Sequence, residues 1–546
     1  MLFGCVDFDL ISESLLPEQC KKAGAPMKVG VMEYDVILVP GCETLRSSTL
    51  QCLENFAEAG GKLIFVGSIP RLENACPSVR GTVLAKRAQH VPFDRGVLLK
   101  TLAPFRTIEI RNETGAITEN LLYQMRQDKE GQWLFVAHGT EPYNKDISRY
   151  QDLKIRVRGT WKAVVDNTLS GEREGIRQDI DGDTTRLYYR MYDYDSLLVW
   201  LEPVGAPKDM EECNVKEDAR LCGKLPETVQ NISLPEMVPY SLSEPNALLL
   251  DQAEYALDDG EWQPKEEILR LDDICRRYLK WPRRRQQVAQ PWTIKEEPVT
   301  HVLHLKWHVL SGIRYVGAQL AIEDAEKLKI KWNHKEIPNT VTGWYVDKSI
   351  KTVALPTIQK GENILEVEMP FGKRTNVEWA YLLGDFGVEI RGRNAGITEM
   401  PKALAFGNIA LQGLPFYGGN ITYHIPVETG GGVLKIQSNR YRGVLQEVSV
   451  DEEAVIPMIY PPYTAELGEV VPGRHEVHLS LYGHRRNGFG PVHFADLKDV
   501  LIEPNVWRST GERWSYEYLI CEEGVLTAPK IFMEDTQKNE QTQEEN

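Results

Sequence analysis

The chain lacks the features that place a protein in a bilayer or on nucleic acid. No run of apolar residues approaches the roughly 18 needed to cross a membrane. Lys and Arg number 63 against 79 Asp and Glu, and the formal charge of −16 repels the phosphates of nucleic acids and anionic lipids. We therefore expect no nucleic-acid partner and no membrane partner, and a neutral ligand fits this charge better.

The sequence also lacks the signs of a disulfide framework and of an export signal. The nine cysteines are odd in number, scattered, and without a C-x-x-C pair, which argues against a disulfide framework or a structural zinc site. Residues 1–9 have neither a basic segment nor a long apolar run. We expect a soluble chain without a signal peptide, cytoplasmic as given, and this expectation holds only if Met1 begins the protein.

An α/β pattern occupies the first part of the chain. Residues 36–40 are a short apolar run that predicts a buried parallel strand. Residues 48–61 have helical spacing and stop at Gly60-Gly61, and residues 62–66 predict the next strand. This βαβ alternation covers only about the first hundred residues, whereas a β/α barrel needs about 250. We therefore expect no catalytic barrel.

The rest of the chain, from about residue 117, changes to short segments of alternating polarity separated by Gly, Asp and Asn turns. Such a density of short strands is typical of antiparallel sandwiches. The expected strands include 132–137, 153–157, 186–192, 197–201, 302–309, 365–369, 433–437 and 477–481. Residues 266–279 are the exception, because their spacing predicts a helix.

Several segments resemble parts of known enzymes. FDLISE (8–13), YDVILVP (34–40) and the Gly60-Gly61 helix stop resemble the amidotransferase-like domain that follows the barrel in large multidomain glycoside hydrolases of the α-L-rhamnosidase type (family 106). GEN (361–363) and YLLGDFG (381–387) are similar to the sugar-binding jelly rolls of family 2 glycosidases. In these enzymes the catalytic carboxylates lie on the barrel, so the resemblance assigns no catalytic residue here.

The resemblance implies a multidomain, mainly β fold in which an incomplete α/β domain precedes jelly-roll sandwiches. The expected boundaries are 1–115 for a truncated α/β amidotransferase-like domain, 116–205 for a β-sandwich, 206–295 for a linker with a helix, 296–395 for a galactose-binding-like jelly roll, 396–535 for a second jelly-roll-like sandwich, and 536–546 for a disordered tail.

Three patterns invite a catalytic or metal-binding interpretation, and each has a simpler one. Cys42 follows a strand, yet it lacks the flanking glycine of a nucleophile elbow. Asp179, Asp181 and Asp183 lack the glycine and glutamate spacing of a calcium loop and fit a hairpin turn. On a strand, His301 faces away from His304 and His308. We expect no catalytic residue, no metal site and no cofactor.

Sugar-binding candidates come from loops that mix aromatic and polar side chains. Pyranose rings stack their C–H faces on aromatic rings while polar groups bind the hydroxyls. Two segments have this mixture, and they supply the candidates Trp344, Tyr345, Glu378 and Trp379, and His484, Arg486, Asn487 and His493. The alternative is that these side chains cap the sandwiches or pack between domains.

The sequence therefore predicts the non-catalytic C-terminal part of a glycoside hydrolase, with a carbohydrate as ligand and a catalytic barrel in the same or an adjacent chain. Two alternatives stay open. One is a free-standing carbohydrate-binding protein, and the other is an intact glycosidase whose site lies on the sandwiches.

Overall fold

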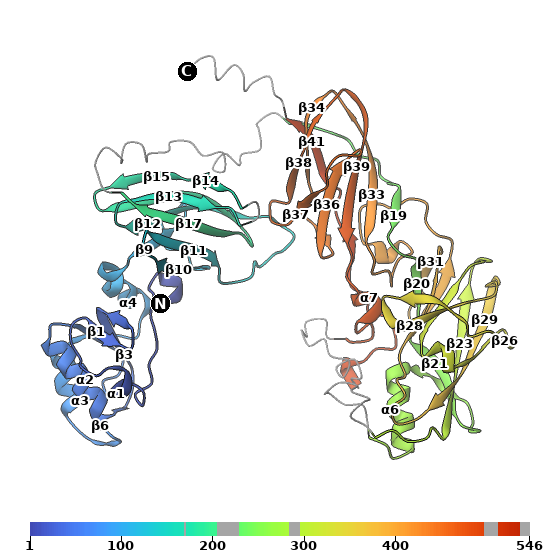
Figure 1. The fold of residues 1–546 in the computed structure, drawn as a ribbon, viewed down its shortest axis with the longest axis horizontal. Coiled ribbons are helices and arrows are strands. Elements are labelled where there is room, and N and C mark those ends of the chain that lie inside the picture. The colour runs from blue at the N-terminus through green and yellow to red at the C-terminus, as the bar shows by residue number, and fades with distance from the viewer. Residues whose placement is uncertain (169–170, 205–228, 283–294, 496–510, 535–546) are drawn as a thin grey trace. The chain divides into compact units, whose positions relative to one another are not determined.

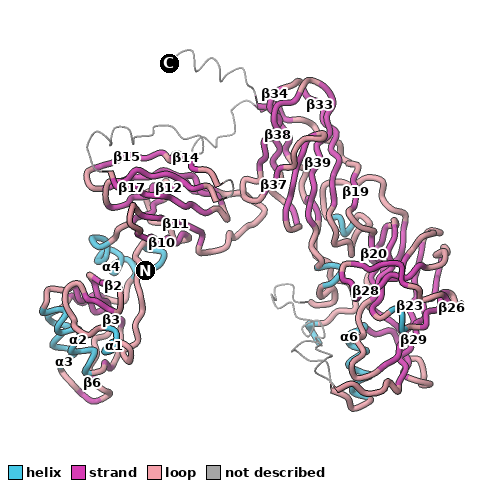
Figure 2. The backbone as a smooth tube through the Cα atoms, in the orientation of Figure 1, coloured by secondary structure: helices cyan, strands magenta, loops and turns pink. Residues whose placement is uncertain are grey.

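The computed structural model describes residues 1–168, 171–204, 229–282, 295–495 and 511–534. The chain divides into two compact units, residues 1–143 with 149–224 and residues 144–148 with 225–546. Strands predominate in both, and most of the helical residues lie in the N-terminal region (Figure 2). In the described residues no helix is long and apolar enough to span a membrane.

The first unit begins with the predicted α/β region (Figure 1). Strands β3, β5 and β8 form a parallel sheet, in which Val36 of β3 is opposite Lys62 of β5. The elements are η1 (Leu2–Gly4), α1 (Leu16–Gln19), β1 (Met27–Val29), β2 (Met32–Tyr34), β3 (Val36–Pro40), β4 (Thr44–Leu45), α2 (Ser47–Glu58), β5 (Lys62–Val66), β6 (Leu72–Glu73), β7 (Cys76–Pro77), α3 (Arg80–Arg87), β8 (Gln89–Val91), α4 (Arg95–Leu102) and η2 (Ala103–Phe105).

The end of helix α2 shows why the two glycines are there. Gly60 has a φ of +88°, which favours glycine because a side chain would be strained in the left-handed region. A Cβ on Gly61 would lie 2.2 Å from the ring of Phe56, which is fully buried. The Gly-Gly pair therefore lets the chain leave the helix and pass directly beneath Phe56 into β5.

A β-sandwich completes the first unit. One sheet has the order β10-β11-β17-β13-β14 and the other β15-β16-β12-β9, and the two share one core. The strands are β9 (Ile108–Arg111), β10 (Leu121–Gln127), β11 (Gln132–His138), β12 (Tyr150–Arg158), β13 (Trp161–Asp166), β14 (Arg173–Gly175), β15 (Arg177–Asp181), β16 (Thr184–Tyr192) and β17 (Ser196–Pro203). Along β16, buried and half-buried residues alternate, as the period-2 pattern predicts.

The second unit contains a jelly-roll sandwich built on a large core. Its sheets have the orders β20-β30-β24-β28-β27 and β22-β21-β23-β29-β25-β26, and β31 and β32 join the second. The elements are β20 (Asn246–Leu250), β21 (Gln252–Leu257), β22 (Gln263–Glu267), α6 (Ile268–Tyr278), β23 (His301–Ser311), β24 (Gln319–Glu323), η4 (Ala325–Lys327), β25 (Lys329–Trp332), β26 (Lys335–Ile337), β27 (Val341–Tyr345), β28 (Asp347–Ala354), β29 (Gly361–Phe371), β30 (Ala380–Gly384), β31 (Gly387–Arg391) and β32 (Asn394–Thr398).

A further sandwich with its own core belongs to the same unit. Its sheets have the orders β18-β41-β34-β38 and β19-β33-β39-β36-β37, and β35 pairs with β40. The elements are β18 (Val229–Asn231), β19 (Tyr240–Leu242), η5 (Ile409–Leu411), β33 (Ile421–Thr429), β34 (Gly432–Gln437), β35 (Tyr441–Arg442), β36 (Leu445–Val450), β37 (Ile456–Met458), β38 (Thr464–Val470), β39 (Gly473–Tyr482), α7 (Arg486–Phe489), η6 (Gly511–Arg513), β40 (Gly524–Val525) and β41 (Lys530–Glu534).

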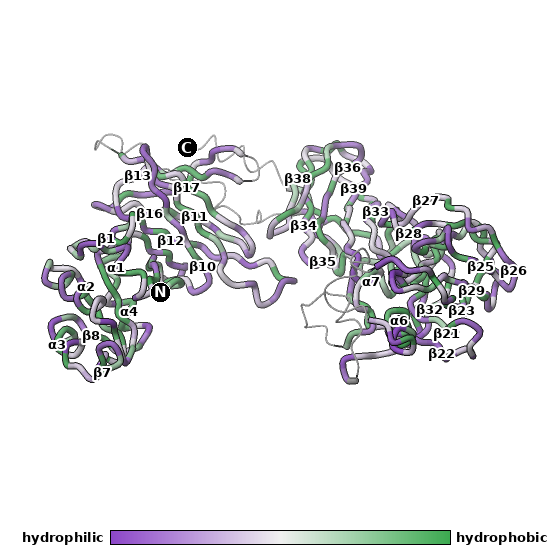
Figure 3. The backbone as a smooth tube through the Cα atoms, turned by 60° about the horizontal axis from the view of Figure 1, so that its bottom comes forward, coloured by the Kyte–Doolittle hydropathy of each residue, from purple (hydrophilic) through white to green (hydrophobic). Residues whose placement is uncertain are grey.

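The chain is thus a multidomain, mainly β protein with antiparallel sandwiches after an α/β region. In the hydropathy colouring, short hydrophilic and hydrophobic stretches alternate within the strands (Figure 3). Because such alternation buries one face of each strand, the fold class could be predicted from the sequence.

The boundaries differ from those expected. The first sandwich already includes β9, whose residue Ile108 pairs with Val157 of β12, so it begins before residue 116. Within the expected linker, residues 229–242 supply β18 and β19 to the last sandwich, and residues 246–278 supply three strands and α6 to the jelly roll. These strands have only three to six residues each, and the polar, acidic stretches around them interrupt the alternating pattern. The expected tail, 536–546, lies outside the described residues.

Candidate functional site

The first set of sugar-binding candidates does not form one aromatic platform. Trp344 and Tyr345 are neighbours on β27, and their exposed fractions are 55% and 5%. Tyr345 packs against the ring of Tyr381 with centroids 5.3 Å apart. The Nε1 of the buried Trp379 donates a hydrogen bond of 2.7 Å to Glu267 Oε1, and Glu378 is half-buried. Trp344 is therefore the member of this set that presents an aromatic face to solvent.

The second set lies on the chain that follows β39, and most of it has structural contacts. Asn487 is 1% exposed, and its amide both donates to the carbonyl and accepts from the N–H of Cys521. His484 accepts a hydrogen bond from the backbone N–H of the half-buried Arg486 at 3.3 Å, and burial lowers the pKa of His484. These contacts fix the loop, and sugar binding by these residues stays a prediction.

His493, also from the second set, lies in a buried polar cluster around Asp251. Residue 251 is where the chain crosses from β20 in one sheet to β21 in the other, so its side chain enters the interior. Asp251 Oδ2 is 2.6 Å from His493 Nε2, and Oδ1 accepts from the hydroxyl of Tyr518 at 2.6 Å. Burial alone would lower the pKa of His493, but the carboxylate of Asp251 raises it overall.

Beside Asp251 lies a small pocket of about 80 Å³. Its lining includes Leu248–Gln252, Glu254, Lys265, Lys306–Val309, Ala395 and Tyr518. Burial lowers the pKa of Lys265, and the Asp251 charge offsets part of that effect. In the described residues Gln252 Oε1 has no hydrogen-bond partner. The pocket wall therefore offers a buried acceptor next to several charged groups.

The charged groups of the wall form a network on the outer face of β21 and β23. Lys306 Nζ is 3.0 Å from Glu254 Oε2, and His308 Nε2 is 3.5 Å from Glu254 Oε1. Burial alone would raise the pKa of Glu254, but Lys306 and His308 lower it below its ordinary value. Glu254 is therefore ionised at neutral pH and accepts hydrogen bonds.

An exposed indole adjoins this network. Trp262, in the turn between β21 and β22, is 45% exposed, and Lys306 Nζ lies 3.9 Å from the centroid of its ring. The His304 ring is 6.4 Å away, centroid to centroid. We call Trp262, His304, Lys306, His308 and Glu254 the β23 face. It combines an aromatic surface with donors and acceptors, which is the chemistry that sugars require.

Most residues of this site are not among the candidates predicted from the sequence. The alternation along β23 placed His304 and His308 on one face, which the structure confirms. Lys306 lies between them on the same face, and Trp262 follows the turn residue Gly260, so both carried a usable signal. No sequence signal pointed to Asp251 and Tyr518, because they are brought together from positions far apart in the sequence.

The sequence patterns that invited a catalytic or metal-binding interpretation have a simpler structural explanation. Cys42 is half-buried, and burial together with Glu13 raises the pKa of its thiol, which disfavours the nucleophilic thiolate. Asp179 and Asp181 pair with Arg186 across the β15–β16 hairpin. His301 Nδ1 is 2.8 Å from Asp258 Oδ2. The seven described cysteines are free.

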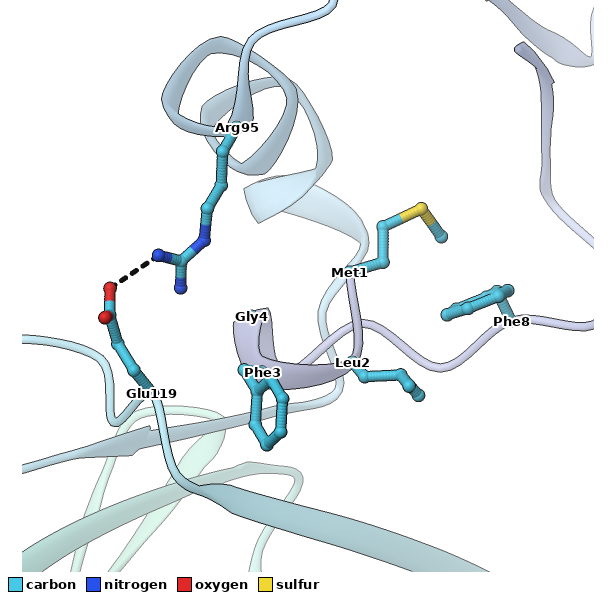
Figure 4. Close-up of a pocket in the computed structure, with 7 residues that line it drawn as sticks. All are labelled: Met1, Leu2, Phe3, Gly4, Phe8, Arg95 and Glu119. Carbon is cyan, nitrogen blue, oxygen red and sulfur yellow. Dashed lines mark hydrogen bonds and ion pairs between the residues drawn. The ribbon is translucent and has the colours of Figure 1, made fainter. Parts of the chain in front are cut away.

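A larger pocket of about 440 Å³ lies in the first unit (Figure 4). It is lined by Met1, Leu2, Phe3, Gly4, Phe8, Arg95 and Glu119. Arg95 Nη1 and Glu119 Oε1 are 2.5 Å apart, and both side chains are mostly exposed. The rest of the lining is apolar, so this pocket offers few groups for a polar ligand.

Comparisons with known proteins find likeness in structure only. No known family and no curated protein sequence matches the chain. A rhamnosidase from Novosphingobium sp. PP1Y is similar over 96% of this chain at 11% identity and a TM-score of 0.43. An exo-carrageenase of family GH42 from Bacteroides ovatus is similar over 35% of this chain and 26% of its own length, at 12% identity and a TM-score of 0.23.

An alpha-L-fucosidase from Paenibacillus thiaminolyticus is similar over 37% of this chain and 44% of its own length, with 9% identity and a TM-score of 0.24. The chain spans 36% of the length of the Novosphingobium rhamnosidase. Identities and TM-scores this low assign no activity to the chain.

Proposed function

We propose that the chain recognises carbohydrate through the β23 face of its jelly roll and is a non-catalytic part of a glycoside hydrolase. The observation that carries this proposal is the exposed indole of Trp262 beside the ion network of Lys306, Glu254 and His308. Because Lys306 Nζ lies over one face of the indole, a pyranose would stack on the other face. The ammonium and the carboxylate of the network would then bind hydroxyls that reach past the edge of the ring. The pocket at Asp251 continues from the same residues and would accept a substituent of the sugar.

The state of the nearby carboxyls supports a binding role over a hydrolytic one. Glycoside hydrolysis needs a protonated acid and an ionised carboxylate that both reach the substrate. Glu254 has a lowered pKa and is paired with Lys306, and Asp251 is engaged by His493 and Tyr518. Burial raises the pKa of Glu267 to about 7, but this side chain is 1% exposed and cannot reach a sugar. The acid and base would then come from a barrel in the same or an adjacent chain.

Binding can be tested against a panel of soluble rhamnose- and galactose-containing polysaccharides by isothermal titration calorimetry. We expect saturable binding that Trp262→Ala weakens by about tenfold, equivalent to about 1.4 kcal/mol of lost contact. Trp344→Ala is the matched control, because this tryptophan is 55% exposed against 45% for Trp262 but lies on the edge strand β27. Circular dichroism of both variants would confirm that they fold.

Three results would contradict the proposal or one of its parts. Loss of binding in Trp344→Ala with full binding in Trp262→Ala would move the site to β27. Release of nitrophenol from aryl rhamnosides or galactosides by the purified chain would favour the alternative of an intact glycosidase with its site on the sandwiches. Binding without hydrolysis by a chain that has no adjacent barrel in its coding region would favour a free-standing carbohydrate-binding protein.

A further inference from the structure

Three ligand-type side chains meet on the outer face of the last sandwich, in a place that the proposed carbohydrate site does not use. His424 lies on β33 and His478 on β39, and the two residues are directly opposite each other in the antiparallel register. Glu476 precedes His478 by two positions and therefore shares its face. Both strands are in the interior of a five-stranded sheet, so the backbone that carries these side chains is held on both sides.

The separations between the ligand atoms suit one small ion. The two Nδ1 atoms of His424 and His478 are 3.1 Å apart. Glu476 Oε1 lies 3.5 Å from His424 Nδ1 and 3.6 Å from His478 Nε2. Four ligands at the zinc distance of about 2.0–2.1 Å are separated by about 3.3 Å along each edge of the tetrahedron. The contacts of His478 with His424 and with Glu476 involve different ring nitrogens, and one ion can use only one of them, so the His478 ring has to turn. With one ligand atom taken from each residue, the three atoms already lie within 4.8 Å of one another.

A neighbouring hydroxyl orients one of the imidazoles. Ser241 Oγ, on β19, is 2.9 Å from Nε2 of His424. If Nε2 donates its hydrogen to this hydroxyl, Nδ1 is left as an unprotonated lone pair facing His478. A second hydrogen-bond partner of this kind commonly fixes the tautomer of a metal-binding histidine.

Within the part of the chain that the structure describes, no lysine or arginine forms an ion pair with Glu476. Among the described residues its ion-pair partners are the two imidazoles of His424 and His478. Glu254 on the outer face of β23 differs, because Lys306 pairs with it in addition to His308. A cation between the three groups would supply the missing positive charge.

We propose that His424, His478 and Glu476 bind a divalent transition metal of the zinc class, with a fourth position open to water. Two imidazoles and one carboxylate are the ligand types that zinc prefers among nitrogen and oxygen donors. The exposed fractions of the three side chains, 27%, 25% and 50%, leave the open position accessible from solvent. This site is independent of the proposed carbohydrate site.

The test is titration of untagged, chelator-treated protein with Zn²⁺ by calorimetry, and with Co²⁺ by visible absorption. We expect one equivalent of Zn²⁺ to bind at micromolar concentration and Co²⁺ to give the intense absorption of a tetrahedral site. His424→Ala and His478→Ala should each abolish the Co²⁺ spectrum, and Glu476→Gln should weaken Zn²⁺ binding by about tenfold. His334→Ala is the matched control, because the side chain of His334, in the turn between β25 and β26, is 69% exposed and pairs only with Glu366 among the described residues.

The proposal is overturned if the wild-type chain binds less than one equivalent of Zn²⁺ at these concentrations. It is also overturned if the folded His424→Ala and His478→Ala variants keep the Co²⁺ spectrum, since the ion would then be held elsewhere in the chain. Circular dichroism of each variant separates loss of the site from loss of the fold, and Glu476→Gln, on the exposed rim, gives a readout that does not depend on either histidine substitution.

Discussion

The two sandwiches of the second unit bury their charged groups in different ways. In the jelly roll, Glu267 accepts hydrogen bonds from the N–H groups of Leu269 and Arg270 and from the indole of Trp379. In the last sandwich, neither carboxylate oxygen of Glu523 has a hydrogen-bond partner among the described residues, although the residue is 1% exposed. Burial raises the pKa of both side chains, to about 7 for Glu267 and about 8 for Glu523.

The difference shows how hydrogen-bond donors limit the rise in pKa of a buried carboxyl group. Desolvation is the largest cause of both shifts, and hydrogen bonds to the ionised form offset it. Glu267 receives three such bonds because it caps helix α6, whereas Glu523 has only the backbone near His484 and the charge of Arg485 to oppose burial. A buried acid in the jelly roll is thus held by its partners, and the one in the last sandwich remains largely neutral at pH 7.

The largest effect on the free energy of unfolding is expected from breaking the buried ion pair of Arg276 and Asp272 in the jelly roll. Arg276 is 1% exposed, lies 2.8 Å from Asp272 Oδ1, and donates to the carbonyls of Lys373 and Thr375. Arg276→Met would remove the main partner of a buried carboxylate, and we expect a loss of about 3–5 kcal/mol in the free energy of unfolding. Hydrogen exchange of the β23 and β29 amides measures this locally.

The control for that substitution is Lys327→Met, which removes an exposed ion pair with Asp324 from the same sandwich. Its expected cost is below about 1 kcal/mol. Equal effects of the two substitutions would contradict the view that the jelly roll depends on its buried pairs.

The next largest effect is expected at Glu523, where we expect substitution to raise the free energy of unfolding rather than lower it. The folded pKa is raised to about 8, so the folded state keeps a proton that the unfolded state releases above about pH 4.5. Stability from this group therefore falls as the pH rises from about 4.5 to 8. Glu523→Gln removes the titration, and we expect a gain of roughly 3 kcal/mol at pH 7 that vanishes at pH 4. Urea unfolding at both pH values measures it, and a gain that does not change with pH would refute the assignment.

A smaller effect is expected at Glu267. Its pKa in the folded state is raised to about 7, so its pH dependence has the same direction as that of Glu523. Its contribution to stability therefore falls as the pH rises from about 4.5 to 7. Glu267→Gln should cost about 1–2 kcal/mol at pH 5, because an amide nitrogen cannot accept the bond from Arg270 N. The cost of Glu267→Gln should shrink by pH 8, because the wild type has by then lost the stabilisation that protonated Glu267 provides. Thermal unfolding monitored across this range checks it, and a cost that grows with pH would contradict the comparison.

The smallest effect is expected on the outer face of the jelly roll. Lys331 Nζ is 2.7 Å from Glu368 Oε1, and both side chains are about 30% exposed. Lys331→Ala should cost less than about 1 kcal/mol, and high salt should reduce the difference because exposed pairs are screened. Unfolding of both proteins in low and high salt would measure it. A large cost that is independent of salt would place this pair among the buried ones.

The strand pattern could be predicted because each strand shows its burial locally. The expected segments at 186–192 and 197–201 correspond to β16 (Thr184–Tyr192) and β17 (Ser196–Pro203), and the expected helix at 266–279 to α6 (Ile268–Tyr278). The site could be predicted only in part. His493 was a candidate, but Asp251, its partner, lies 242 positions away, and no local pattern relates the two.

The sequence by itself therefore determined the class of the protein, mainly β after an α/β start, and which face of β23 carries its histidines. These features follow from alternation and turn residues, which act between near neighbours in the chain. Only the tertiary structure decided which polar residues meet. The crossing of the chain between sheets at Asp251 buries that side chain, and the register of β33 with β39 sets His424 against His478. Register and crossing depend on the packing of whole sheets, which no short segment encodes.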